Sequence, residues 1–202
     1  DDGTPLHWDV YTPSNPGPWP VVLVIHGGGF VETDGGTQMA NAIEAFRSAG
    51  YLTFNVEYRL APPGSLSGQT SDGRYPQQPN DCKVAVRAAR ADPRCKGQVG
   101  AVGGSAGATH AVYIAADGIA GQDKVDVAVG LSGAYDFSDP VSLTSFVFKS
   151  KVENYCFPGN PPPEPTYSAT LLADSDVTKV MSNVSPLMLV QSDNESMHYP
   201  QM

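Results

Sequence analysis

The stretch that decides the fold is QVGAVGGSAGATHAVYIAA, residues 98–116. Its first seven residues predict a buried strand, and the alanine-rich run at 106–116 predicts a helix. Between the two lies GGSAG, at 103–107, which has the order G-x-S-x-G. In a sharp turn of this kind the serine takes a strained backbone conformation, so its neighbours must be nearly free of side chains. The neighbours of Ser105 that meet this demand are Gly103, Gly104, Ala106 and Gly107.

The same alternation of strand and helix continues on both sides of this stretch. Further strands are expected at 6–11, 21–25, 51–58, 125–133 and 186–192, and further helices at 38–48 and 81–91. Strands that alternate with helices favour a parallel sheet with right-handed crossovers and helices on both faces. A length of 202 residues fits one such α/β domain, spanning 1–202.

The region 138–180 breaks this alternation. About fifty residues separate the last two expected strands, which is too long for a bare crossover. Its middle, CFPGNPPPEPTYS at 156–168, is dense in proline and is expected to run as an exposed loop. We therefore expect an insertion or cap-like region over the carboxyl ends of the strands.

Composition limits the range of partners. Twenty-one acidic and twelve basic side chains give a net charge of −9, which repels a phosphate backbone and argues against nucleic acid. The same charge favours neutral small-molecule or polysaccharide-linked substrates, although a local patch can override it. No apolar run approaches the roughly 18 residues that a membrane-spanning helix needs, so no membrane partner is expected.

The three cysteines give no sign of a metal site. Cys82, Cys95 and Cys156 lack the paired spacing of metal ligands. Cys82 and Cys95 would lie at opposite ends of the helix expected at 81–91, too far apart for a bridge. A disulfide would therefore have to use Cys156, and the alternative is three free thiols.

A second glycine-rich motif, HGGGF at 26–30, follows the strand at 21–25. Consecutive glycines let backbone N–H groups approach an oxyanion without a Cβ in the way. The candidate donors are Gly28, Gly29 and Ala106, and Phe30 is expected to line the pocket. GGSAG alone also fits a capped helix turn, but both motifs should emerge at the carboxyl ends of parallel strands and share one pocket. A phosphate cradle is the rival, but the G-x-G-x-x-G order and the P-loop lysine are absent.

HGGGF, EYRLAP at 57–62, the DP turn at 92–93 and GGSAG together resemble the hormone-sensitive-lipase-like and feruloyl/acetyl-esterase-like carboxylesterases. The resemblance implies the α/β-hydrolase fold and cofactor-free hydrolysis of carboxylic esters by a Ser, acid and His triad. It also implies that Gly28 and Gly29 are oxyanion donors, in agreement with the steric argument. His26, Gly27, Gly103 and Gly107 would then shape the site.

The acid of the triad is expected after the strand at 186–192. In the family an Asp stands five positions into a short loop there, and the matching residue of this chain is Glu195. Asp193 is the second candidate, and Asp136, just after the strand at 125–133, is a third. A carboxylate of either length can orient an imidazole. An acidic loop exposed to solvent is the alternative.

The histidine is the missing element of the sequence pattern. His26 belongs to the glycine loop, His110 is expected to pack or lie at the surface, and His7 precedes the core. His198 lies only three residues beyond Glu195, whereas the family's base follows the next strand. We expect the base beyond Met202, together with a final strand and helix, so that the chain is truncated at its C-terminus.

Two functions from different classes follow. The first is a serine carboxylesterase that forms an acyl-enzyme on Ser105 and acts on neutral short-acyl, acetyl or feruloyl esters without a cofactor or metal. The second is a non-catalytic ligand-binding relative, in which the pocket persists but no imidazole reaches Ser105. A purely structural role has little support, because no repeat or heptad pattern is present.

Overall fold

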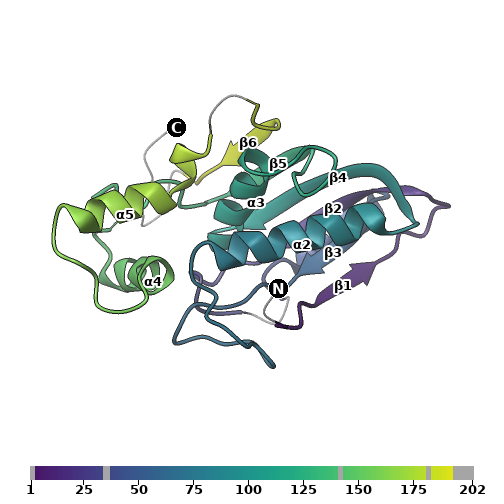
Figure 1. The fold of residues 1–202 in the computed structure, drawn as a ribbon. Helices are drawn as coiled ribbons and strands as arrows, with labels where there is room; N and C mark the ends of the chain where they lie inside the picture. The colour runs from purple at the N-terminus through teal and green to yellow at the C-terminus, as the bar shows by residue number, and fades with distance from the viewer. Residues whose placement is uncertain (1–2, 34–36, 141–142, 181–182, 193–202) are drawn as a thin grey trace.

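The computed structural model describes residues 3–33, 37–140, 143–180 and 183–192. Its centre is a sheet of six strands in the order β1-β3-β2-β4-β5-β6 (Figure 1). Only β1 runs antiparallel, against β3, and the other neighbours pair in parallel. The strands are β1 (Trp8–Tyr11), β2 (Trp19–Ile25), β3 (Leu52–Val56), β4 (Cys95–Gly104), β5 (Val127–Leu131) and β6 (Leu187–Val190). The predicted mostly parallel sheet is confirmed.

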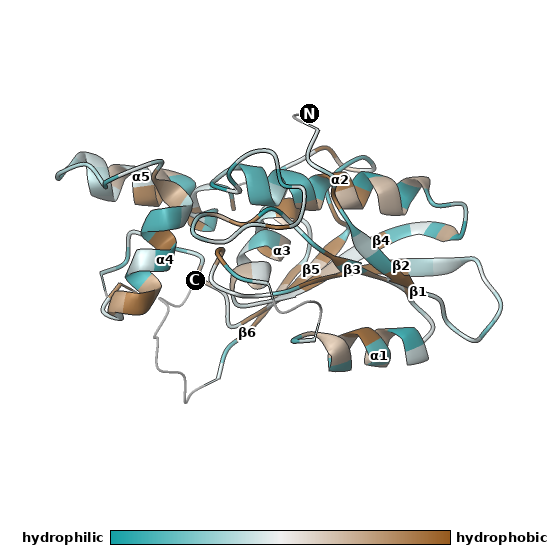
Figure 2. Ribbon diagram, turned by 90° about the horizontal axis from the view of Figure 1, so that it is seen from below, coloured by the Kyte–Doolittle hydropathy of each residue, from teal (hydrophilic) through white to brown (hydrophobic). Residues whose placement is uncertain are grey.

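Helices cover both faces of this sheet, as the alternating sequence pattern predicts (Figure 2). One face carries α1 (Ala40–Ser48), and the other carries α2 (Gln77–Ala91) and α3 (Ala106–Ala116). Both faces of β2 are apolar, and its alternate residues belong to two different hydrophobic clusters. Leu23 and Ile25 pack with α2 and α3, whereas Val22 and Val24 pack with α1. A strand with two apolar faces needs cover on both sides.

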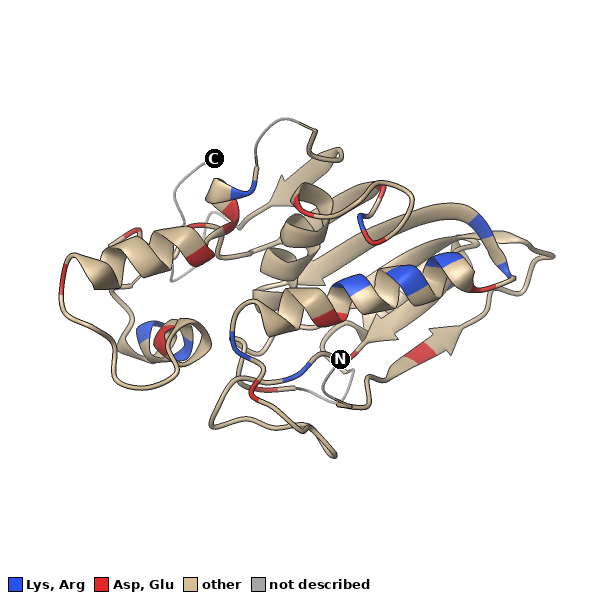
Figure 3. Ribbon diagram, in the orientation of Figure 1, with Lys and Arg blue, Asp and Glu red and all other residues tan. Residues whose placement is uncertain are grey.

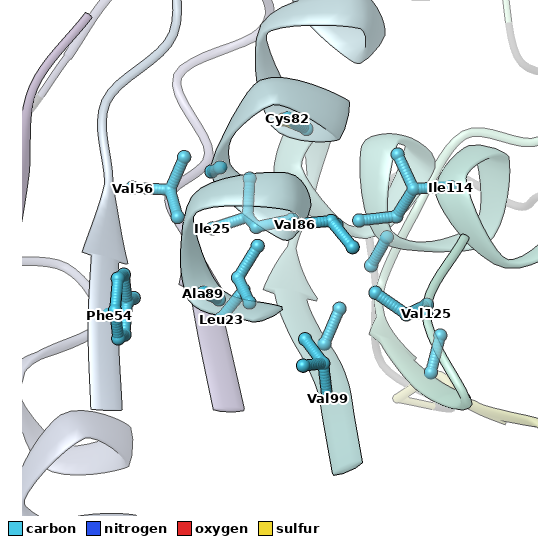
Figure 4. Packing of buried hydrophobic residues seen from close by; sticks show 14 of the residues in the cluster. Leu23, Ile25, Phe54, Val56, Cys82, Val86, Ala89, Val99, Ile114 and Val125 are labelled. Carbon is cyan, nitrogen blue, oxygen red and sulfur yellow. The ribbon is translucent and has the colours of Figure 1, made fainter. Parts of the chain in front are cut away.

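The main core lies between the sheet and the α2–α3 layer (Figure 4). Val86 and Ala89 of α2 and Ile114 of α3 face Leu23 of β2 and Phe54 of β3, and each of these five side chains is at most 1% exposed. Burial of this apolar surface is the main term that favours folding. The core fixes the strands, and thereby fixes where their carboxyl ends lie.

The region between β5 and β6 contains helices that the sequence analysis did not predict. They are α4 (Phe146–Cys156), α5 (Thr166–Asp174) and the short 3-10 helix η1 (Asp176–Thr178). Figure 1 shows α4 and α5 beyond one end of the sheet, and the proline-rich loop between them is shorter than the expected 156–168. Phe148, Val152 and Tyr155 are buried at helical spacing, which explains the α4 conformation.

Two further observations concern the helices and the thiols. None of the described helices is long and apolar enough to cross a bilayer. Cys82, Cys95 and Cys156 are free thiols, as one of the two interpretations of the sequence predicts. Burial raises the pKa values of Cys82 and Cys156 well above the usual range, so these thiols stay protonated and behave as core residues.

The core makes a direct prediction for stability. Leu23→Ala removes a wholly buried side chain from β2 and should lower the free energy of unfolding by about 3 kcal/mol. Leu172→Ala, at a position on α5 that is 44% exposed, is the matched control and should cost about 1 kcal/mol or less. Urea denaturation followed by circular dichroism measures both. Equal losses in the two variants would contradict the assigned core.

Candidate active site

Ser105 lies at the turn between β4 and α3 in an uncommon backbone conformation. Its φ is 53° and its ψ is −120°, and the first residue of α3 follows directly. This region of the backbone map is sparsely populated for residues with a side chain. The Ser105 N–H donates to the carbonyl oxygen of Leu131 on the neighbouring strand at 2.9 Å, which ties the turn to β5. Ser105 is partly exposed, so its hydroxyl has access to solvent.

The glycines around Ser105 are required by close backbone approaches. A Cβ at Gly103 would overlap the carbonyl of Gly107 one turn later. A Cβ at Gly107 would overlap the carbonyl oxygens of Ile25 and His26, where β2 leads into the glycine loop. Gly104 differs, because a Cβ there would meet only the Met39 Sδ, at 3.3 Å. The turn and the glycine loop therefore lie directly against each other.

The glycine loop follows β2 and passes beside Ser105. A Cβ at Gly27 would lie 3.1 Å from the Ser105 Cβ. Gly28 has a φ of 113°, which only glycine adopts readily, and a Cβ there would overlap the carbonyl oxygen of Glu32. The N–H groups of Gly28 and Gly29 have no acceptor among the described residues. They are free to donate to a ligand.

A cavity of about 300 Å³ brings the two motifs together. The described residues that line it are Gly28, Gly29, Ser105, Ser145, Val147, Phe148 and Lys151. The first three come from the glycine loop and the β4–α3 turn, and the other four come from the first half of α4 and the residue before it. A polar hollow of about 510 Å³ lies elsewhere, along α2, but Ser105 does not line it.

The glycine loop is held in shape by hydrogen bonds that involve His26, Tyr58 and Gln38. The Nδ1 of His26 lies 2.6 Å from the carbonyl oxygen of Gly27, and the His26 ring stacks on Tyr58 at 4.4 Å. The Tyr58 hydroxyl donates to the carbonyl oxygen of His26 at 2.9 Å. The Gly27 N–H donates to the Oε1 of Gln38 at 2.6 Å. These bonds fix the loop without using the N–H groups of Gly28 and Gly29.

The segment EYRLAP braces the same loop from beneath. Tyr58 makes the contacts given above, and the Ala61 N–H donates to the carbonyl oxygen of Phe30 at 2.9 Å. Arg59, between them, forms a buried ion pair with Asp81 on α2, with 2.5 Å between Nη2 and Oδ1. The additional bonds from the Arg59 Nε and N–H satisfy the buried carboxylate, as a buried ion pair requires. The segment thereby joins the loop to α2.

His110 lies on α3 beneath the loop and is wholly buried. Its Nε2 is 2.9 Å from the Oε1 of Gln78, whose Nε2 donates to the carbonyl oxygen of Phe30 at 2.7 Å. Because the Gln78 oxygen accepts, the His110 proton belongs on Nε2, and its Nδ1 is buried without a partner. Burial, and to a smaller extent His26, lower the pKa of His110 from 6.5 to about 3. His110 is therefore a neutral packing residue.

Phe30 does not line the cavity, contrary to the sequence-based expectation. Its φ is 70°, and its ring is wholly buried, stacked on Tyr155 of α4 at 4.3 Å. Phe137 packs edge-on against the same ring at 5.6 Å. The positive φ turns the side chain inward, so Phe30 links the glycine loop to α4 and has no open surface for a substrate.

The acid and base candidates fall mostly outside the described residues. Glu195, Asp193 and His198 all lie in 193–202, directly after β6. Asp136 is described: its Oδ1 accepts from the N–H and the hydroxyl of Ser138, at 2.9 and 2.6 Å, and it does not line the cavity. Among the described histidines, His7 is exposed near the start of β1.

Several residues at the site had no signal in the sequence. Lys151, Ser145 and Phe148 reach the cavity because α4 lies at that end of the sheet, and the cap-like region expected at 138–180 does not single out these three residues. Tyr58 lies within the EYRLAP segment quoted above, so that motif does indicate a residue that contacts the glycine loop. Across the described parts of the chain, no group of three or more His, Cys, Asp or Glu is arranged to hold a metal ion.

The glycine contacts predict losses of stability of different size for two adjacent substitutions. Gly103→Ala should lower the free energy of unfolding by at least about 2 kcal/mol, because the new Cβ meets backbone that cannot move alone. Gly104→Ala should cost less than about 1 kcal/mol, because a flexible methionine side chain can shift. Thermal unfolding of both proteins provides the measurement. A Gly103→Ala protein as stable as the Gly104→Ala protein would rule out the packed turn.

The neutral His110 predicts a pH dependence of stability. Its folded-state pKa of about 3 lies below its usual 6.5, so between these values the unfolded chain binds the extra proton. Stability is complete above about pH 6.5 and falls as the pH drops, by about 1.4 kcal/mol per pH unit from this group. His110→Gln keeps a donor toward Gln78 but does not titrate. Urea unfolding from pH 6 to 4 should show a shallower loss in the variant, and identical slopes would contradict the assignment.

Solved structures with a similar arrangement include two esterases. A truncated carbohydrate esterase from gut microbiota matches with a TM-score of 0.73 and 16% identity, over 94% of this chain and 72% of that one. An acetyl ester-xyloside bifunctional hydrolase from Caldicellulosiruptor lactoaceticus matches with a TM-score of 0.68 and 20% identity, over 95% of this chain and 68% of that one. At these identities the likeness shows the fold, and the predicted α/β-hydrolase fold is confirmed.

Sequence comparison adds a curated relative and a family. The non-reducing polyketide synthase Preu6 of Preussia isomera is 33% identical over 75 residues, which are 36% of this chain and 3% of that protein. The BD-FAE family matches over residues 8–198, nearly the whole chain. The resemblance to esterases of the α/β-hydrolase class is thereby confirmed, and the chain belongs to the BD-FAE family.

Proposed function

We propose that the protein is a serine carboxylesterase with Ser105 as its nucleophile. The observation that carries the proposal is the shared cavity, in which Ser105 faces the same space as Gly28 and Gly29. A hydroxyl beside unoccupied backbone N–H groups is the arrangement that acyl transfer needs. The strained φ of Ser105 adds support, because such a conformation persists only where the surrounding structure holds it.

The proposed reaction has two halves. In the first, the Ser105 Oγ bonds to the acyl carbon while its proton passes to the base, and the carbonyl oxygen becomes an oxyanion. The N–H groups of Gly28, Gly29 and Ala106 donate to that oxygen. The bond to the alcohol then breaks, and the alcohol oxygen takes the proton from the base. In the second half, water adds to the acyl group by the same route and releases the acid and Ser105.

The remaining members of the triad are part of the proposal. We assign the acid to Glu195, with Asp193 and then Asp136 as alternatives, because Glu195 follows β6 in the sequence and β6 pairs in parallel with β5. The base is a histidine outside the described residues. His26 and His110 are excluded from that role by their buried contacts with Tyr58 and Gln78, which leave neither ring on the cavity.

The substrate is proposed to be an ester of a short acyl, acetyl or feruloyl group, free or linked to a sugar. Two of the similar structures support the sugar-linked form, since one is a carbohydrate esterase and the other is an acetyl ester-xyloside bifunctional hydrolase. Val147 and Phe148 form an apolar wall of the cavity, and Ser145 contributes a hydroxyl group. The net charge of −9 favours substrates that are neutral overall.

A ligand-binding protein without catalysis is the second candidate. One observation favours it: no described histidine lines the cavity with Ser105. Such a protein would bind esters in the same cavity and leave them intact. The two candidates differ in the reactivity of Ser105.

A fluorophosphonate probe distinguishes these candidates on the full-length protein. Wild type should be labelled and Ser105→Ala should not, and ester turnover should fall roughly a millionfold in the variant, the loss expected for a nucleophile acting in a triad. Ser132→Ala is the matched control, because Ser132 directly follows β5, has a similar φ of 55° and does not line the cavity. Labelling that survives in Ser105→Ala would refute the assignment, and ester binding without labelling would favour the second candidate.

A further inference from the structure

The cavity beside Ser105 contains one charged side chain among its described lining residues, and it is a cation. Lys151 lies on α4, and its side chain is 24% exposed. No acidic residue shares this lining. Figure 3 shows basic and acidic residues together on α4, beyond the end of the sheet. A positive group in this place is unexpected in a chain whose net charge is −9.

The Lys151 side chain is held against the glycine loop. A Cβ built at Gly29 would overlap the Lys151 Cδ and lie 3.3 Å from its Nζ. The aliphatic stem therefore covers Gly29, and the ammonium group is placed at the edge of the loop. Because Gly29 lines the cavity with Ser105, the charge lies beside the space where a substrate ester must bind.

The present partner of Lys151 is weakly held. Its Nζ lies 3.1 Å from the Oε1 of Glu32, whose side chain is 65% exposed. An ion pair with so exposed a carboxylate contributes about 0–1 kcal/mol, because water and salt screen it. Glu32 lies outside the cavity lining. A carboxylate brought in by a ligand can therefore replace Glu32 at the Lys151 ammonium at small cost.

We propose that Lys151 is a specificity-determining residue that selects esters carrying a carboxylate near the scissile bond, such as an acyl half-ester or an ester of an acidic sugar. This inference rests on the proposed function and adds a substrate class to it. The ester group is neutral, but the whole substrate is then an anion, so local attraction at Lys151 overrides the preference for neutral substrates that the net charge gives. The recognised charge lies on the part of the molecule that runs past Gly29 toward α4.

Other cations near the site do not compete for this role. Lys149, two residues earlier on α4, lies 5.6 Å from the centre of the Tyr167 ring and 3.8 Å from Glu153, so it points toward α5. Arg59 is locked in its buried pair with Asp81. Lys151 is thus the residue whose charge can meet a ligand in the cavity, and Lys149 is its natural control.

The test uses two fluorophosphonates of equal length on the full-length protein. One ends in a carboxylate and the other in a primary carboxamide of the same shape, and the second-order rate of Ser105 labelling is measured for each. The carboxylate-to-amide rate ratio isolates recognition of the charge. Lys151→Met, which keeps the apolar stem over Gly29, should lower this ratio about fivefold. Glu32→Gln, which removes the competing carboxylate at an exposed position, should raise it.

Two controls accompany these variants. Lys149→Met should leave the ratio unchanged, since that amine does not face the cavity. Raising the salt concentration should lower the wild-type ratio, because the attraction is screened.

The outcomes separate this inference from the proposed function. An unchanged ratio in Lys151→Met overturns anion selection while leaving the esterase intact. Equal slowing of both probes also overturns it, because the amine would then act on the reacting centre and not on the substituent. If neither probe labels wild type, or if labelling persists in Ser105→Ala, the proposed function fails and takes this inference with it.

Discussion

The contact on which the site depends is a backbone-to-backbone approach between the β4–α3 turn and the end of β2. Gly107 lies so close to the carbonyl oxygens of Ile25 and His26 that no side chain fits between them. Two parallel strands place their carboxyl ends side by side, but only this approach brings the Ser105 hydroxyl and the N–H groups of the glycine loop to one cavity. The packed core holds Ser105 in its strained conformation. The close approach at Gly107 is therefore needed both for packing and for the geometry of the site.

The sequence predicts the parts of this protein that local sterics and periodicity govern. The strand at 21–25, the helix at 106–116 and the glycine positions of the turn follow from such rules and are found in the structure. Tertiary placement is a different matter: α4 reaches the site only because its buried face packs on the Phe30 ring, and a single sequence does not show that contact. The Phe30 side chain points inward because its φ is positive, and the HGGGF motif does not predict a positive φ at that residue. The acid assignment in 193–202 and the identity of the base remain predictions.

Net charge and local charge act over different distances, and this difference decides what the cavity attracts. At physiological ionic strength the screening length is about 8 Å, so the acidic groups that give the chain its charge of −9 act weakly across the molecule. A lysine amine that lines a small, partly apolar cavity acts at contact distance and with less solvent screening. The net charge therefore affects how substrates approach the protein, whereas Lys151 determines which substrate groups bind in the cavity.

The buried polar groups beneath the glycine loop fix its shape by hydrogen bonds alone. Gln78 accepts from His110 and donates to the carbonyl oxygen of Phe30, so one amide orients both a ring and the loop. An imidazolium at His110 would place a proton on an Nδ1 that has no acceptor, and burial makes that charge costly. Keeping this layer neutral leaves the N–H groups of Gly28 and Gly29 as dipoles that line the cavity with Ser105. For N–H dipoles to stabilise an oxyanion, the groups beneath them must hold the backbone rigidly and need not be charged. The hydrogen-bonded layer of Tyr58, His110 and Gln78 provides this rigid support.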